Sequence, residues 1–153
     1  MLPIHAAPTC SVAGAAEIVG SKWTVLIVHD LSEGPRRFTE LECSCAGISP
    51  RTLAERLRWL ETEDIVARQS YPESPPRVEY ALTEKGLDLY PVLVSLMQWG
   101  TRHGGGDTPI VLQHKGCGAT VEPHLACPEC GEAVGARDMR ALPGPDAVLR
   151  QTA

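Results

Sequence analysis

The feature that most constrains this chain is a helix with a well-marked start. Ser49 is a favourable N-cap residue, and Pro50 suits the first helical position, where its missing N–H is not needed. The helix is expected to run to about Asp64. At 100° per residue, three leucines lie within about 60° of one another and predict a buried stripe. These are Leu53, Leu57 and Leu60, and the opposite face carries Arg51, Glu55, Arg58 and Thr62.

Apolar periodicity predicts helices on both sides of this one. An alanine-rich helix is expected over 11–19 and a second over 22–34, whose core face is predicted to be Trp23, Leu26, Ile27 and Leu31. A short third helix begins near Arg36 and cannot pass Gly47. The final helix is expected over 84–103, weakened by Gly86 and Pro91, with a kink at the proline.

Two alternating segments predict the strands. Residues 66–71 and 77–82 alternate in polarity, and the proline-rich stretch 72–76 lies between them. This pattern is typical of a β-hairpin. Counted from the helix over 22–34, three short helices are followed at once by a hairpin, which is the order of a winged helix-turn-helix, in which the last of the three helices enters the DNA major groove. In this chain the helix that begins at Pro50 takes that place.

Several motifs carry a resemblance to a known family. They are Cys10-Ser-Val-Ala, Gly20-Ser-Lys-Trp-Thr, Gly34-Pro-Arg-Arg-Phe, Gly47-Ile-Ser-Pro-Arg-Thr-Leu, the hairpin sequence from Tyr71 to Tyr80, Leu82-Thr-Glu-Lys-Gly, and Pro91-Val-Leu with Trp99-Gly. With these, residues 10–103 resemble the HxlR family of bacterial winged-helix transcriptional regulators. The resemblance implies a homodimer on palindromic operators, in which the first and last helices of each subunit form the dimer contact.

Within that interpretation, the expected DNA-binding residues fall into two groups. Arg51 and Thr52, in the first turn of the reader helix, are best placed to contact base edges. Ser49 is expected to donate to a phosphate, and the backbone contacts are expected from Arg37, Arg56, Arg58 and Arg77. The alternative is that some of these arginines only pair with nearby glutamates on a solvated helix. The formal net charge of −5 and pI of about 5.5 favour selective contact over nonspecific coating of DNA.

The tail contains a metal-ligand pattern. His114, Cys117, Cys127 and Cys130 form two pairs, each with two residues between its members, and a glycine follows Cys117 and Cys130. This spacing predicts a structural zinc site, with His124 as the alternative to His114, and an empty or oxidised hairpin as the alternative to zinc. Such a metal would contribute on the order of 10 kcal/mol to folding a segment of this size.

The other cysteines call for separate interpretations. Cys10 precedes the first helix, whose dipole favours a thiolate, and the resemblance implies that a cysteine there senses oxidants or electrophiles. The alternative is a small apolar residue in the dimer contact. Cys43 and Cys45 are either resolving partners for Cys10 of the other subunit or simply tolerated.

These observations predict an α+β, mainly α fold. It comprises an N-terminal arm (1–9), a winged helix-turn-helix with a long C-terminal dimerisation helix (10–103), a glycine-rich linker (104–109), a small zinc-ribbon-like β appendage (110–136) and a tail (137–153). The histidines sit in no catalytic motif, so we expect a DNA-binding protein and no enzyme. We expect this protein to be cytoplasmic. The alternatives are a regulator that responds to a small molecule without redox sensing, and a winged-helix and zinc-ribbon module for protein interaction. We found no membrane-spanning run, secretory signal or internal repeat in the sequence.

Overall fold

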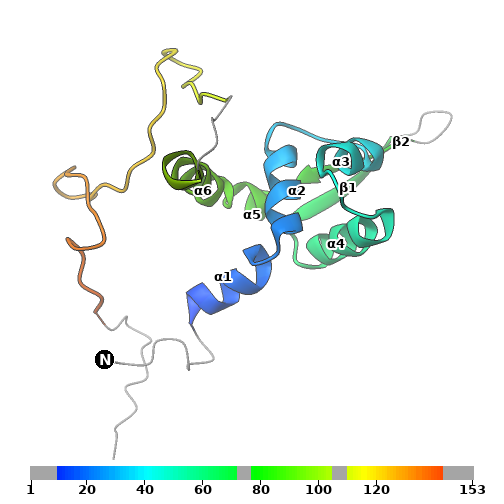
Figure 1. The fold of residues 1–153 in the computed structure, drawn as a ribbon, viewed down its shortest axis with the longest axis horizontal. Coiled ribbons are helices and arrows are strands. Elements are labelled where there is room, and N and C mark those ends of the chain that lie inside the picture. Colours follow the sequence, from blue (N-terminus) through cyan, green and yellow to red (C-terminus); the bar gives the residue numbers. More distant parts are fainter. Residues whose placement is uncertain (1–9, 72–76, 105–109, 143–153) are drawn as a thin grey trace, which may run out of the picture. The chain divides into compact units, whose positions relative to one another are not determined.

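The computed structural model describes residues 10–71, 77–104 and 110–142. The predicted arm 1–9, the hairpin tip 72–76, nearly all of the linker and the end of the tail lie outside these residues. Contacts divide the chain into two units, Met1–Gly106 and Asp107–Ala153. From here on, the second unit as a whole is called the tail. The first unit contains the helices and the hairpin of Figure 1.

Helices α1 (Ser11–Val19) and α2 (Lys22–Ser32) form where the periodicity predicts them. The predicted core face of α2 is wrong in one position. Ile27 and Leu31 are buried, but Leu26 is 42% exposed, and Thr24 and Val28 are buried instead. The buried face of α2 is therefore rotated about the helix axis from the one that the leucines and the tryptophan predict.

Helices α3 (Phe38–Ser44) and α4 (Pro50–Thr62) form the helix-turn-helix. Ser49 Oγ accepts a hydrogen bond from the Thr52 N–H at 3.1 Å, so the predicted N-cap is confirmed. At its end, the Asp64 N–H donates to Glu61 O and the Ile65 N–H to Leu60 O, with Asp64 at φ 56°. This is a Schellman termination with an aspartate where glycine is usual.

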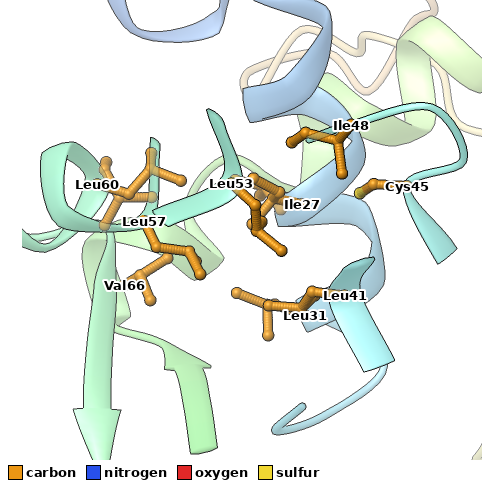
Figure 2. Close-up of a cluster of buried hydrophobic side chains, with 11 residues drawn as sticks. Ile27, Leu31, Leu41, Cys45, Ile48, Leu53, Leu57, Leu60 and Val66 are labelled. Carbon is orange, nitrogen blue, oxygen red and sulfur yellow. The ribbon is translucent and has the colours of Figure 1, made fainter. Parts of the chain in front are cut away.

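The leucine stripe of α4 packs into the core. Leu53, Leu57 and Leu60 are at most 1% exposed, as predicted. Figure 2 shows them facing Ile27 and Leu31 of α2. The cluster is completed by Val28, Leu41, Cys45, Ile48, Ile65 and Val66. Because α4 buries this stripe, its opposite face is held outward.

Strands β1 (Val66–Tyr71) and β2 (Arg77–Leu82) form the predicted antiparallel hairpin, in which Val66 pairs with Leu82 and Tyr71 with Arg77. A further bridge joins Arg36 to Tyr80, through N–H···O bonds of 2.9 and 2.8 Å. The segment before α3 is thus tied to the hairpin, which orients the wing relative to the helix-turn-helix.

The predicted single helix over 84–103 is wrong: it is two helices, α5 (Glu84–Leu87) and α6 (Tyr90–His103). Pro91 lies in the first turn of α6, where a residue without an N–H is tolerated, so it begins a new helix there. In Figure 1, α2 lies between α6 and the α3–α4 pair, and α2 contacts all three.

Within the described residues, no single helix is long and apolar enough to cross a membrane. Helices α1 and α2 together have the length and the apolar composition of a membrane span, but they form a pair bent by 79°.

Candidate nucleic-acid interface and cysteine sites

The first turn of α4 presents the predicted base-contacting residues. The Arg51 side chain is 88% exposed, and its Nε donates to Glu55 Oε1 at 2.9 Å. An exposed pair of this kind contributes at most about 0.5 kcal/mol, so it leaves Arg51 free to exchange Glu55 for a base edge. The hydroxyls of Thr52 and Ser49 lie 2.8 Å apart. The structure therefore brings Ser49, Arg51 and Thr52 together at the exposed start of the helix.

The other two arginines of α4 have different surroundings. Arg58 is exposed. Arg56 is half-buried, its guanidinium carbon lies 5.1 Å from the centre of the Trp59 ring, and its Nε is buried without a hydrogen-bond partner. Stacking on Trp59 restrains Arg56 at the edge of the helix, whereas Arg58 extends freely from the exposed face.

Arg37 and Arg77 meet at one carboxylate. Glu79 Oε1 lies 2.6 Å from an Arg77 terminal nitrogen and 3.8 Å from Arg37 Nε, and the Glu79 side chain is 14% exposed. Glu79 is not among the site residues predicted from the sequence. Alternation along the strand assigns it a face but not a partner 42 residues earlier in the chain, since Arg37 and Glu79 meet only in the fold. Glu79 therefore links the start of α3 to the wing and holds both arginines there.

The three cysteines of the first unit differ in accessibility. Cys10 is half-buried at the N-cap of α1 and makes no side-chain cap hydrogen bond. Cys43 is exposed, whereas Cys45 is 1% exposed with its Sγ 3.8 Å from Asp30 Oδ2. Burial, and secondly the Asp30 charge, raise the pKa of the Cys45 thiol above its ordinary value. Cys45 is therefore held as a neutral thiol inside the helix-turn-helix.

Two turns in the tail hold the predicted metal ligands. In the first turn, the His114 N–H donates to Ala119 O and the Gly118 N–H to His114 O, and His114 Nδ1 lies 3.2 Å from Cys117 Sγ. In the second, the Cys127 N–H donates to Glu132 O and the Gly131 N–H to Cys127 O.

The surroundings of the second turn affect its first thiol. Hydrogen bonds from the backbone N–H groups of Cys130 and Glu129 lower the pKa of Cys127. Among the described residues, however, no three of the His, Cys, Asp and Glu side chains are brought together in an arrangement that could hold a metal ion. The structure thus forms each ligand pair and does not join the two pairs.

The turns reveal an internal repeat that the sequence analysis missed. The bridge and three backbone hydrogen bonds of the first turn recur 13 residues later: the bridge Gln113–Thr120 recurs as Ala126–Ala133, and the bond from Val121 N–H to Leu112 O as that from Val134 N–H to Leu125 O. The shared pattern is Leu-x-(His or Cys)-x-x-Cys-Gly-x-x-Val. The substitution of His114 for a cysteine conceals it from a search for repeated cysteines.

One apolar pocket lies between the helices of the first unit. Its lining comes from α1, α2, the turn before α6 and α6: Val19, Thr24, Val25, Val28, Leu89, Val92, Leu93 and Leu96. The cavity volume is about 10 Å³, close to the space of one water molecule. In a single chain it accommodates no organic effector.

Known proteins share this architecture. Residues 18–107 match the HxlR-like helix-turn-helix family. An uncharacterized HTH-type transcriptional regulator of Mycobacterium tuberculosis is 42% identical over 137 residues, which cover 88% of this chain and 86% of that protein. This alignment is longer than the winged-helix region, so it includes residues of the tail.

Solved structures of other proteins are also similar to this chain, among them the following two. PA1607 superimposes with a TM-score of 0.78 at 30% identity, covering 88% of this chain and 95% of that chain. The redox regulator HypR in its oxidized form superimposes with a TM-score of 0.59 at 35% identity, covering 65% of this chain and 100% of that one.

Proposed function

This chain belongs to the HxlR-like helix-turn-helix family and is a transcriptional regulator of the helix-turn-helix type, and from this premise we propose that it binds palindromic operators as a homodimer. The observation that carries the proposal is the first turn of α4. The leucines of α4 are buried in the core, and the Arg51 side chain in its first turn, on the opposite face, is 88% exposed. A major groove admits a helix presented in this way. The protein acts by binding and has no catalytic activity of its own.

The roles of the arginines follow from their surroundings. Arg51, with Thr52, reads base edges, and Glu55 beside them accepts from a cytosine amino group and repels phosphate. Arg77 and Arg37, restrained by Glu79, contact phosphates and add affinity without sequence information. Arg58 adds a further phosphate contact, and Ser49 donates a hydrogen bond to the backbone. Arg56 contributes less, because its stacking on Trp59 limits its reach.

The test compares Arg51→Ala with Arg77→Ala on DNA selected by the wild-type protein and on a scrambled sequence. We expect Arg51→Ala to weaken binding to the selected site about 10- to 100-fold and to leave scrambled DNA nearly unchanged. Arg77→Ala should weaken both alike and reduce the salt dependence. Arg137→Ala, which removes one exposed charge in the tail, is the control. Equal losses on both DNAs for Arg51→Ala would contradict its assigned role.

Exposed apolar side chains support the homodimer. Helix α1 has no buried residue, and Val12 on it is 67% exposed. On α6, Leu96 is 47% and Trp99 64% exposed. Apolar residues left in water on two helices fit a surface that a second copy covers. In this interpretation, Trp99→Glu shifts the protein to monomers in sedimentation and lowers operator affinity, whereas Arg102→Glu, one turn later, changes the mass little.

A second proposal concerns the signal. We propose that thiol oxidation at Cys10 controls DNA binding, because Cys10 lies at the start of the α1 surface and because one structural neighbour is named a redox regulator. An oxidant of the diamide class would take two electrons and two protons from Cys10 and from Cys43 or Cys45 of the other subunit, and leave a disulfide. A small-molecule effector is the alternative, which the size of the pocket does not favour in a single chain.

The chain itself offers the means to test this. Diamide should produce a cross-linked dimer on non-reducing gels and change operator affinity, and Cys10→Ala should abolish both effects. Cys43→Ser and Cys45→Ser identify the resolving thiol, because only the variant that lacks it should lose the cross-link. Unchanged mobility and affinity after diamide would overturn the proposal.

A further inference from the structure

We propose that the tail binds one zinc ion through His114, Cys117, Cys127 and Cys130, and that the metal joins its two repeated turns into a single small module. This inference is independent of DNA binding. It begins from the repeat, since two copies of one turn, each with two soft ligands, supply the four ligands of a closed tetrahedral site.

The backbone of each turn suits a metal ligand pair. Gly118 and Gly131, which directly follow Cys117 and Cys130, have φ values of 71° and 73°. Side chains other than glycine rarely adopt this conformation, so the glycines allow the chain to reverse directly after the second ligand. A glycine with positive φ follows the second ligand in both copies, which indicates that both turns serve to bind a metal.

The first ligand pair already has nearly the right spacing. His114 Nδ1 and Cys117 Sγ are 3.2 Å apart. Zinc bonds of about 2.0 Å to nitrogen and 2.3 Å to sulfur, at a tetrahedral angle, separate the two ligand atoms by about 3.5 Å. The His114 ring is also seated over the turn, because a Cβ added to Gly116 would lie 3.0 Å from its Cε1. A shift of a few tenths of an ångström therefore brings this pair to the separation that zinc requires.

The repeat also identifies the fourth ligand. His114 occupies the position that Cys127 occupies in the second copy, and both precede the second ligand by three residues. His124 corresponds instead to Val111, before the turn begins, and its Nδ1 lies 3.3 Å from the backbone oxygen of Glu122. His124 is therefore outside the site, and its removal provides a control matched in chemistry to removal of His114.

The rest of the tail leaves a need that a metal fills. Among the described residues of this unit, 110–142, no side chain is buried, and Val111 and Leu125 are 64% and 65% exposed. A segment of this kind cannot hold two turns together by apolar burial. Zinc would replace the missing core, and the three thiols would release their protons to solvent as they bind it.

The test measures metal content of the full-length protein, purified under reducing conditions and reconstituted with zinc. We expect about one zinc per chain. Cys117→Ser, Cys130→Ser and His114→Ala should each lose most of it, and His124→Ala and Cys43→Ser should retain it. With Co²⁺ in place of zinc, the wild-type protein should show the intense visible absorption of a tetrahedral thiolate site, and His114→Ala should alter that spectrum more than His124→Ala.

Three outcomes would overturn the proposal. They are a reconstituted wild-type protein with far less than one zinc per chain, a loss of zinc in His124→Ala with retention in His114→Ala, and a loss in Cys43→Ser as large as in Cys130→Ser. The wild-type metal content decides the matter even if a variant cannot be purified. Helical circular dichroism of each variant verifies that the winged-helix unit is folded.

Discussion

The two units of this chain are built in opposite ways. In the winged-helix unit, buried side chains hold the elements together, and nearly all of the core cluster is at most 2% exposed. In the described residues of the tail, order comes from backbone hydrogen bonds within two turns, and no side chain is buried. The difference teaches that the units should respond to different perturbations. A change in the core should not affect metal binding, and a change in the ligands should not unfold the core.

The largest effect is expected in the core. Leu57→Ala removes a side chain that is 1% exposed at the centre of the leucine stripe, and should lower the free energy of unfolding by about 2–5 kcal/mol. Urea denaturation followed by helical circular dichroism measures it. Cys130→Ser, the matching change in the tail, should leave the free energy of unfolding of the winged-helix unit within about 0.5 kcal/mol of wild type. A similar loss in both variants would show that the units fold as one.

A backbone contact in the first unit gives the next effect. Gly86 packs directly on the backbone before the hairpin, so that an added Cβ would lie 2.2 Å from Ile65 O. Gly86→Ala must displace that carbonyl and should cost about 1–3 kcal/mol in the same urea experiment. Gly100→Ala is the control, because a Cβ there meets nothing within 4 Å in the part of the chain that the structure describes. A loss of stability in the control that equals that of Gly86→Ala would remove the steric explanation.

Local rules predicted most elements of the first unit, but not the break between α5 and α6. Ser49 and Pro50 mark the start of α4, and alternation marks both strands of the hairpin, since caps and period-two patterns depend on neighbouring residues alone. The buried face of α2 was harder to predict. Leu26 is exposed and Thr24 buried, because neighbouring helices decide which face is covered.

For the candidate sites, prediction from the sequence was limited by contacts between residues far apart in the chain. The sequence placed Arg51 and Thr52 in the first turn of α4, where the Arg51 side chain is 88% exposed and Thr52 is half-buried. It did not predict the meeting of Arg37 and Arg77 at Glu79, which depends on how α3 lies against β2. It also did not reveal the 13-residue repeat, because a histidine replaces a cysteine in the first copy, whereas the matching hydrogen bonds of the two turns make the repeat plain.

Thiol chemistry offers a finer comparison of the units. The pKa of buried Cys45 is raised and that of Cys127 is lowered, so in metal-free protein at neutral pH Cys127 should alkylate at least about tenfold faster than Cys45. Mass spectrometry of peptides after timed alkylation measures both rates. Equal rates would show that Cys45 is not protected by the fold.

The raised pKa of Cys45 should make the stability of the first unit sensitive to alkaline pH. A raised pKa in the folded state means that the neutral Cys45 thiol contributes stability below its unfolded pKa, and that this contribution is lost as pH rises through the folded pKa. The urea midpoint of the wild-type protein should therefore fall at alkaline pH more than that of Cys45→Ala. Parallel pH profiles would contradict this assignment.

The smallest effect is a gain in stability, at the end of α4. Asp64 has φ 56°, a left-handed conformation that glycine adopts at lower cost, and its charge opposes the helix dipole. Asp64→Gly should therefore raise the free energy of unfolding by about 0.5–1 kcal/mol. Asp64→Asn removes the charge alone and should gain less. Asp64→Ala removes the charge but disfavours the left-handed conformation, so a gain there equal to that of glycine would show that electrostatics, and not the backbone, limits this end of the helix. Because the change lies in the first unit, metal content should be the same in all three variants.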